Sequence, residues 1–244
     1  MVALQVAQGD AVSVVRGLAA AGLLGASVTA PLKETVLAAC DELAPAAAAI
    51  GAVNCLAFVD HKVVGHNTDA EGFVRGLMQR DVLPTGGSAL VLGAGGAARA
   101  IAHGLTPYVA PVVVARNPSQ VTWCKALPWQ ADVLARECAR TQLVVDCTSA
   151  SGSAASLAAF VGSVPLALTP ENCVVAGLNY AHASPLQAAA QALGRRWYDG
   201  RAMLVHQGVL AQQRWLPSHP IWHDAAMVRA LTVQMEDALV AALR

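Results

Sequence analysis

A lysine and an aspartate stand in two short polar motifs in the first third of the chain. Lys33 follows Val28-Thr29-Ala30-Pro31-Leu32, and Asp69 follows Asn67-Thr68. Reduction of a ketone develops negative charge on the carbonyl oxygen, which a nearby ammonium group can stabilise and protonate. A carboxylate beside the lysine would orient it and hold it charged. The two residues therefore indicate a proton-transfer pair suited to carbonyl reduction.

Each of these residues has a simpler explanation when it is taken alone. A lysine at the start of a helix is usually solvated, and an aspartate at that place usually caps the helix. The order of the motifs favours chemistry, because a dinucleotide-type glycine loop follows both of them. Gly93, Gly95 and Ala98 form the pattern G-x-G-x-x-A between a buried apolar run and a helical segment.

The glycine loop has the sequence expected of a pyrophosphate site. Gly93 permits a tight turn, Gly95 lets phosphate approach the backbone, and Ala98 allows close packing of the helix on the strand. Gly96 and Ala97 open the helix, whose free N–H groups attract phosphate. A glycine turn that binds nothing is the alternative, and the strand before the loop and the helix after it favour binding.

The strand after the glycine loop ends without the acidic residue that binds the ribose of NAD. Arg116 stands at that place and Asn117 follows it. Because an arginine can bind a 2′-phosphate and stack on adenine, the sequence favours NADP as the cofactor. A solvated surface arginine is the alternative.

The order of the motifs resembles that of the shikimate dehydrogenase family, and the resemblance extends along nearly the whole chain. That family reduces 3-dehydroshikimate to shikimate with NADPH, a step in chorismate and aromatic amino acid biosynthesis. The resemblance implies that Lys33 and Asp69 are catalytic. It also implies that Thr29, Asn54 and Gln207 bind the substrate.

Further cofactor contacts are implied by the same resemblance. Residues 200–207 are close to the family pattern Gly-x-x-Met-Leu-Val-x-Gln, which places Gly200 and Met203 near the nicotinamide. Thr148 lies in a loop that resembles the family's Asn-Ala-Thr-Pro, although Asp146 replaces its asparagine. A carboxylate near pyrophosphate is unfavourable unless it points away or caps a turn. Tyr180 occupies a motif tyrosine, but the family's next proline is absent here.

The chain of 244 residues is 55% hydrophobic and 13% charged, which is enough apolar material for two α/β units. The fold class expected is an N-terminal α/β substrate domain, with an incomplete sheet, plus a Rossmann-type dinucleotide-binding domain. We expect the first domain to cover residues 1–83, completed by helices from 206–244, and the second to cover 84–205. Strands are predicted at 2–6, 26–29, 53–59, 62–65, 89–92, 111–115, 143–147 and 174–178. Helices are predicted at 11–21, 33–41, 45–50, 69–79, 97–105, 203 onward and 228–243.

The family's opening strand and its Ser-x-Ser loop, which binds the substrate carboxylate, have no counterpart in this sequence. Three explanations stay open: a misassigned start, a degenerate homologue, or a group from a partner chain that fills the gap. The missing strand would leave backbone groups unpaired in the first sheet, and this makes a homodimer conceivable. A non-catalytic nucleotide-binding homologue and a quinate or aminoshikimate dehydrogenase are the alternative functions.

Charge and cysteine usage restrict the partners and the compartment. The net charge is zero and there is no basic stripe, so a small-molecule substrate is expected rather than nucleic acid. No apolar run approaches the roughly 20 residues of a membrane span. Six scattered cysteines favour reduced thiols in a cytoplasm. His219 and His223 have no acidic residue nearby that could complete a metal site, so no metal is expected. His66 belongs to no recognised motif and is interpreted as structural.

Overall fold

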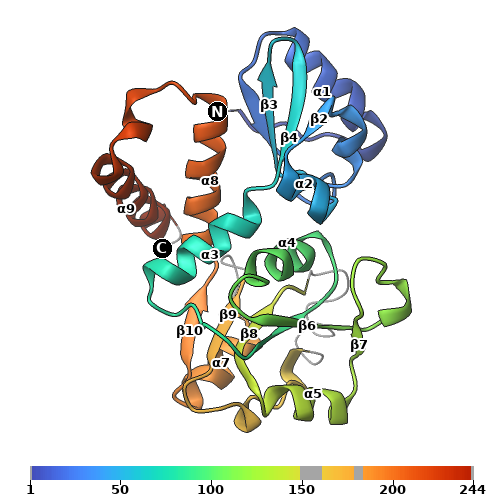
Figure 1. The fold of residues 1–244 in the computed structure, drawn as a ribbon, viewed down its shortest axis with the longest axis vertical. Helices are drawn as coiled ribbons and strands as arrows, with labels where there is room; N and C mark the ends of the chain where they lie inside the picture. The colour runs from blue at the N-terminus through green and yellow to red at the C-terminus, as the bar shows by residue number, and fades with distance from the viewer. Residues whose placement is uncertain (1, 149–160, 179–183, 243–244) are drawn as a thin grey trace.

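Two β-sheets joined by a long helix make up the computed structural model, which describes residues 2–148, 161–178 and 184–242 (Figure 1). The described strands are β1 (Gly25–Ser27), β2 (Glu42–Leu43), β3 (Cys55–Val59), β4 (Lys62–His66), β5 (Ser88–Leu92), β6 (Ala110–Ala115), β7 (Leu127–Pro128), β8 (Thr141–Asp146), β9 (Val174–Gly177) and β10 (Arg196–Asp199). The α-helices are α1 (Ala11–Ala20), α2 (Pro45–Ile50), α3 (Asp69–Gln79), α4 (Gly96–Leu105), α5 (Ala131–Cys138), α7 (Pro185–Ala192), α8 (Arg201–Trp215) and α9 (Ala225–Ala242). The 3₁₀ segments are η1 (Gln8–Asp10), η2 (Thr35–Ala39), η3 (Pro118–Gln120), η4 (Leu166–Leu168) and η5 (Pro220–His223).

The larger sheet has the strand order β10-β9-β8-β5-β6-β7, and its neighbouring strands are parallel. Side chains of successive residues in β5 point to opposite faces of the sheet. Leu90 and Leu92 pack in a core with α5 and α7, whereas Val91 packs in a core with α3 and α4. Burial on both faces explains why these strands read as continuous apolar runs. The sheet confirms the predicted α/β fold with a Rossmann-type unit.

The smaller sheet has the order β1-β3-β4-β2. β3 and β4 form an antiparallel hairpin whose turn residues Asp60 and His61 both have positive φ. β2 runs parallel to β4, and β1 runs antiparallel to β3. α1 and η2 cover one face of this sheet, where Val15, Val36 and Leu56 share a core.

The strand predicted at residues 2–6 is not formed, and this prediction is wrong. The segment has no regular structure before η1, and Val2 and Leu4 are 82% and 58% exposed. A five-residue apolar run becomes a strand when a neighbouring strand pairs with it, and no described strand does so here. β1 consequently lies at an edge of the sheet, with β3 as its partner among the described residues.

The C-terminal helices return to the smaller sheet and to α3 (Figure 1). The Trp215 indole at the end of α8 donates a hydrogen bond to the Leu56 carbonyl of β3 at 2.9 Å. Glu236 on α9 forms an ion pair with Arg80, just after α3. No helix among the described residues is both long and apolar enough to cross a membrane.

Helix α3 lies between the two sheets, and glycines allow its close contacts (Figure 1). A Cβ at Gly72 would lie 2.8 Å from the backbone nitrogen of Gln207 on α8. A Cβ at Gly104 on α4 would lie 2.7 Å from the Ala70 carbonyl oxygen of α3. A Cβ at Gly76 would overlap the hydroxyl of Tyr198, whose ring packs edge-on against Phe73.

We predict that Gly76→Ala lowers the free energy of unfolding by about 1–3 kcal/mol, because the added methyl group overpacks a filled core. The buried ring of Tyr198 has little room to move away. Gly17→Ala is the matched control: Gly17 is an exposed residue inside α1, with nothing within 4 Å of an added Cβ. That variant should be more stable by roughly 0.5–1 kcal/mol. Urea denaturation measures both, and equal stability of Gly76→Ala and the unmodified chain would contradict the packing argument.

Candidate active site

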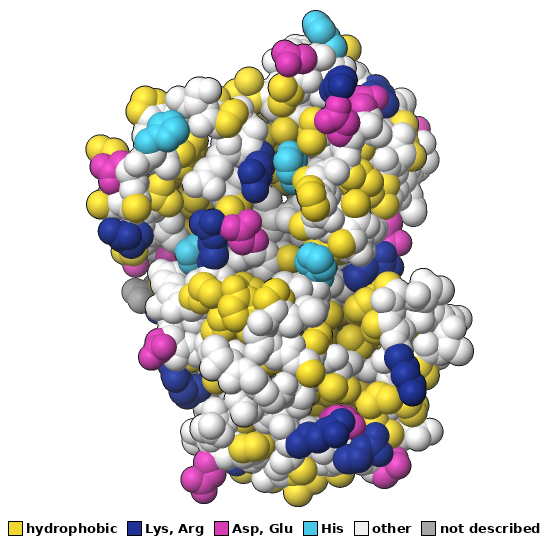
Figure 2. Space-filling model, viewed as in Figure 1, with side chains coloured by type: hydrophobic (Ala, Val, Ile, Leu, Met, Phe, Trp, Pro, Cys, Tyr) yellow, Lys and Arg dark blue, Asp and Glu magenta, His cyan; other side chains and the backbone are white. Residues whose placement is uncertain are grey.

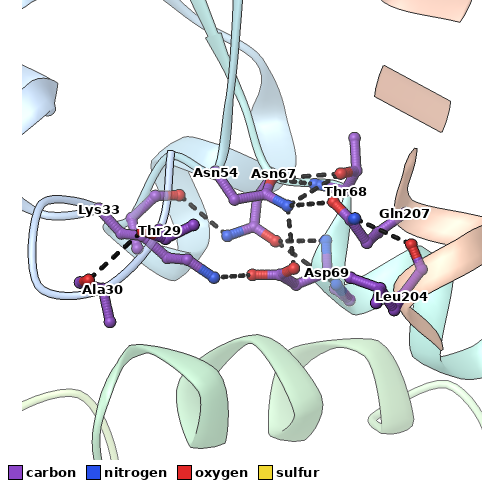
Figure 3. A network of polar contacts seen from close by, with 11 residues as sticks. Thr29, Ala30, Lys33, Asn54, Asn67, Thr68, Asp69, Leu204 and Gln207 are labelled. Carbon is purple, nitrogen blue, oxygen red and sulfur yellow. Dashed lines mark hydrogen bonds and ion pairs between the residues drawn. The ribbon is translucent and has the colours of Figure 1, made fainter. Parts of the chain in front are cut away.

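Lys33 and Asp69 form an ion pair at the junction of the smaller sheet and α3 (Figure 3). The Lys33 Nζ lies 2.7 Å from the Asp69 Oδ2. The lysine side chain is 22% exposed and the aspartate side chain 8% exposed, so the pair is largely shielded but the ammonium still reaches the surface. The two residues singled out as a proton-transfer pair are therefore in direct contact.

Asn54 occupies the centre of the network and is buried. Its Nδ2 lies 2.9 Å from the Asp69 Oδ1, 2.9 Å from the Thr68 hydroxyl oxygen and 3.3 Å from the Gln207 Oε1. Its Oδ1 accepts the Thr68 N–H at 2.7 Å. Asn54 therefore ties the start of α3 to α8, because it contacts both Asp69 and Gln207.

The start of α3 is capped by Asn67, and this explains why Asp69 is available to the lysine. The Asn67 Oδ1 accepts the N–H groups of Asp69 at 3.1 Å and of Ala70 at 3.4 Å. Its Nδ2 donates to the Ala52 carbonyl at 3.0 Å. Asp69 is the first helical residue and not the cap, so the simple explanation of Asp69 as a helix cap is wrong. Both carboxylate oxygens face Lys33 and Asn54 instead.

Thr29 stands apart from this network. It is exposed, on the segment that leads from β1 to Lys33, and its hydroxyl donates to the Ala30 carbonyl at 3.4 Å (Figure 3). The structure thus brings together Lys33, Asp69, Asn54 and Gln207, and it leaves Thr29 at the surface beside them.

A hollow of about 290 Å³ lies at the glycine loop that precedes α4. Gly93 has φ of 104°, and a Cβ there would lie 3.0 Å from the Cys147 carbonyl oxygen, so this position requires glycine. An added Cβ at Gly95 or Gly96 would meet nothing within 4 Å, which leaves the loop open to a ligand. The residues predicted to bind the cofactor that line the hollow are Gly93, Gly95, Arg116, Asn117 and Thr148.

The charges at this hollow suit an anionic ligand. The Asp146 Oδ1 accepts the Thr148 N–H at 3.0 Å and its hydroxyl at 2.6 Å, so the carboxylate caps a turn. Burial, with Asp146 next to it, raises the pKa of the Cys147 thiol well above its ordinary value, so this lining thiol is neutral. Arg116 is exposed at the end of β6, where it can meet a phosphate. The residues present therefore fit a phosphorylated dinucleotide.

The other residues predicted to bind the cofactor do not line this hollow. Ala98 is buried in the core beneath the loop, and Gly96 and Ala97 form the first turn of α4. Gly200 and Met203 lie apart from the hollow, at the start of α8, where a Cβ on Gly200 would lie 2.8 Å from the Leu178 carbonyl oxygen. Tyr180 lies outside the described residues.

Gln120 and Trp129 are among the lining residues of the hollow that the sequence analysis did not predict. Gln120 belongs to the 3₁₀ segment η3, and Trp129 follows the two-residue strand β7. Neither element has a periodicity that a sequence pattern can detect. The described residues contain no group of three or more His, Cys, Asp or Glu side chains that could hold a metal ion.

A parallel Rossmann-type sheet with an open glycine loop, beside a shielded lysine–aspartate pair, defines an α/β oxidoreductase of the dinucleotide-dependent class. A family model described as the shikimate dehydrogenase substrate binding domain matches residues 1–56. The chain is 37% identical to the shikimate dehydrogenase (NADP(+)) of Acidiphilium cryptum, over 95% of this chain and 84% of that protein. The chain belongs to the shikimate dehydrogenase family.

Solved structures agree with this assignment. The shikimate 5-dehydrogenase of Thermus thermophilus, in complex with NADP(H) and shikimate, has a TM-score of 0.72 and 29% identity, over 92% of this chain and 83% of that one. The 5-ketofructose reductase of Gluconobacter sp. strain CHM43, in its ligand-free form, has a TM-score of 0.70 and 28% identity, over 95% of this chain and 86% of that one. Similar folds therefore occur in proteins named for different substrates.

We predict that Arg116→Ala weakens the binding of NADP by at least about tenfold and that of NAD far less, because a charged hydrogen bond to the 2′-phosphate is lost. Fluorescence titration of the purified chain with each dinucleotide measures both constants. Arg136→Ala is the control, because that exposed arginine on α5 contacts Glu137. An equal loss for NADP and NAD would mean that Arg116 serves packing alone.

Proposed function

We propose that this protein catalyses the reversible NADP-dependent reduction of 3-dehydroshikimate to shikimate, a step in chorismate and aromatic amino acid biosynthesis. The observation that carries the proposal is the contact of 2.7 Å between Lys33 and Asp69 within a network that includes Asn54 and Gln207. Family membership supports the same reaction, since the relatives compared above are named for it.

Lys33 is the proton donor in this proposal. When bound, NADPH supplies the hydride that adds to the carbonyl carbon. The ammonium of Lys33 stabilises the negative charge that develops on the carbonyl oxygen and transfers a proton to it. Asp69 positions the ammonium through their contact. In the reverse direction the same lysine, once neutral, accepts the hydroxyl proton.

The substrate hydroxyls are proposed to bind Asn54, Gln207 and Thr29. The Asn54 amide already lies between Asp69 and Gln207, so a hydroxyl placed there meets both carboxamides. The Thr29 hydroxyl has a long bond of 3.4 Å to its neighbour, which a substrate oxygen can replace. The group that binds the substrate carboxylate is not among these residues.

The dinucleotide is proposed to lie across the glycine loop, since helix N-termini and exposed backbone N–H groups bind pyrophosphate. Arg116 and Asn117 take the 2′-phosphate, and Gly200 and Met203 lie toward the nicotinamide half. The other residues proposed to contact the cofactor are Gly93, Gly95, Gly96, Ala97, Ala98 and Thr148.

We predict that Lys33→Ala lowers kcat by roughly 10²-fold or more, as loss of a proton-transfer group commonly does. Absorbance of the reduced nicotinamide, with shikimate and NADP as substrates, measures turnover. Lys62→Ala is the matched control, because Lys62 pairs with Glu42 on the exposed side of β4. Turnover of Lys33→Ala equal to that of the control would remove Lys33 from the mechanism.

The same assay separates the remaining substrates. Quinate and fructose, each with NADP or NAD, are compared with shikimate at equal concentration. A higher kcat/KM with quinate or fructose would assign a related reaction. A folded protein that binds NADP but oxidises none of these substrates would be a non-catalytic homologue.

We also propose that the chain acts in the cytoplasm and forms a homodimer. All six cysteines are free, and burial raises the pKa of the Cys55 and Cys138 thiols to about 12, so these thiols are unreactive, as expected in a reducing compartment.

The homodimer is proposed from the sheet edge. The outer edge of β1 has no partner strand among the described residues, and an open edge favours pairing with a second chain. Sedimentation velocity should give a dimer at micromolar concentration, and a concentration-independent monomer would contradict the assembly.

A further inference from the structure

A second hollow, of about 440 Å³, lies where α3, α4 and α8 meet the end of β4. Figure 2 shows histidine, basic and acidic side chains around the middle of this face, between α8 and β4 above and α4 below. α4 begins at the glycine loop and ends at this hollow, so about 15 Å of helix separates it from the cofactor site. Lys33, Asp69, Asn54 and Gln207 do not line it, whereas Asn67 and Thr68, which hydrogen-bond to Asp69 and Asn54, do.

One wall of the hollow carries an arginine and two histidines. Arg214 of α8, His66 of β4 and His103 of α4 line it, and none of their side chains makes an ion pair or hydrogen bond with another described residue. Glu71 is the acidic residue on the lining, and its carboxylate is held by Arg75 at 2.6 Å. The hollow therefore presents three nitrogen-bearing groups without a counterion.

The charge of Arg214 acts on the neighbouring imidazole. Burial, together with the charge of Arg214, lowers the pKa of His66 below its ordinary value. An anion in the hollow would offset the charge of Arg214 and accept hydrogen bonds from the guanidinium and from the imidazoles. A carboxylate suits the planar donor pair of an arginine.

Most of the remaining lining is apolar. It includes Ala44, Pro45, Ala46, Ala70, Val74, Pro107 and the ring of Tyr108, and the polar side chains beside them are Asn67 and Thr68. A strongly hydrated ion gains nothing from such a surface, whereas a ligand with an apolar body buries area against it. The two walls together specify a molecule with one charged end and one apolar end.

We propose that this hollow is a binding site for a small carboxylate with a compact apolar or aromatic body, and that the ligand does not contact Lys33 or Asp69. Arg214 binds the carboxylate, His66 and His103 assist it, and the ring lies on Pro107 and Tyr108. The ligand joins elements of both sheets, because the lining comes from β4 and α3 as well as from α4. This binding does not depend on the proposed reaction.

Benzoate is the probe, and benzamide is its neutral counterpart of the same shape. Isothermal titration calorimetry of the purified chain should show that benzoate binds at least about tenfold more tightly than benzamide, since the charge-assisted bonds require the carboxylate. Arg214→Gln should weaken benzoate by at least about tenfold and leave benzamide unchanged. Arg214 is exposed, so this variant should keep its fold.

Two further variants make the test specific. Arg229→Gln removes the same charge from the exposed face of α9 and should leave the affinity for benzoate unchanged. Lys33→Ala disables the proposed reaction and should also leave it unchanged. Equal affinity for benzoate and benzamide, or no effect of Arg214→Gln, would overturn the proposal. Loss of benzoate binding in Lys33→Ala would place the ligand in the catalytic network and overturn it as well.

Discussion

The contact of α3 with α8 and α4 is possible because glycines occupy the points of closest approach, and the candidate catalytic groups take their positions from it. Gly72 brings the backbone of α3 against Gln207, and Gly104 brings α4 against Ala70. Asp69 begins α3, so the same packing that fixes the helix also fixes the carboxylate. A helix with larger side chains at these positions would stand farther from α8 and would separate Gln207 from Asn54.

The polar network is built to satisfy groups that have lost water. A buried charge is costly unless it is both paired and hydrogen-bonded, and Asp69 has Lys33 on one oxygen and Asn54 on the other. The N-terminus of α3 adds a favourable dipole at the carboxylate. Asn67 takes the capping task that Asp69 would otherwise perform, and this division of roles leaves the carboxylate for the lysine.

The sequence predicts the long periodic elements well, because each has a clear apolar face and a chemical boundary. Pro45 opens α2 and Ile50 ends it as expected, and α3 covers the predicted residues 69–79. The failures share a cause, since very short or tertiary-dependent elements carry little local signal. The helix predicted at 33–41 is the shorter 3₁₀ segment η2. β7 has two residues, and residues 2–6 have the apolar pattern of a strand without a described strand to pair with.

The site residues also divide into those that a local motif marks and those that only the fold brings to the site. Lys33, Asp69 and Asn54 stand in motifs whose spacing can be recognised, but their contacts depend on backbone pairing between distant segments. The capping role of Asn67 could not be separated from that of Asp69, because both residues are common at helix starts. Trp129 and Gln120 reach the glycine loop through the fold of the larger sheet, so no local pattern marks them.

The segment that carries Lys33 is short of sheet support, and it is held by bonds from other parts of the chain. The Val28 N–H donates to the Asn54 carbonyl at 2.8 Å, and the Val53 N–H donates to the Lys33 carbonyl at 2.8 Å. Arg99, in the first turns of α4, donates to the Ile50 carbonyl at 2.9 Å and lies 3.8 Å from Glu34, the neighbour of Lys33.

Arg99 of α4 reaches the segment next to Lys33 for a geometric reason. A Cβ at Gly51 would lie 2.6 Å from the Arg99 guanidinium, so the glycine there is what admits the side chain between the units. The guanidinium also lies 5.7 Å over the Trp123 ring, and the Trp123 indole donates to the Ala94 carbonyl in the glycine loop at 3.3 Å. These contacts therefore run from the glycine loop through Trp123 and Arg99 to the segment that holds Lys33. They join the proposed cofactor loop of the larger sheet to the proposed proton donor beside the smaller sheet.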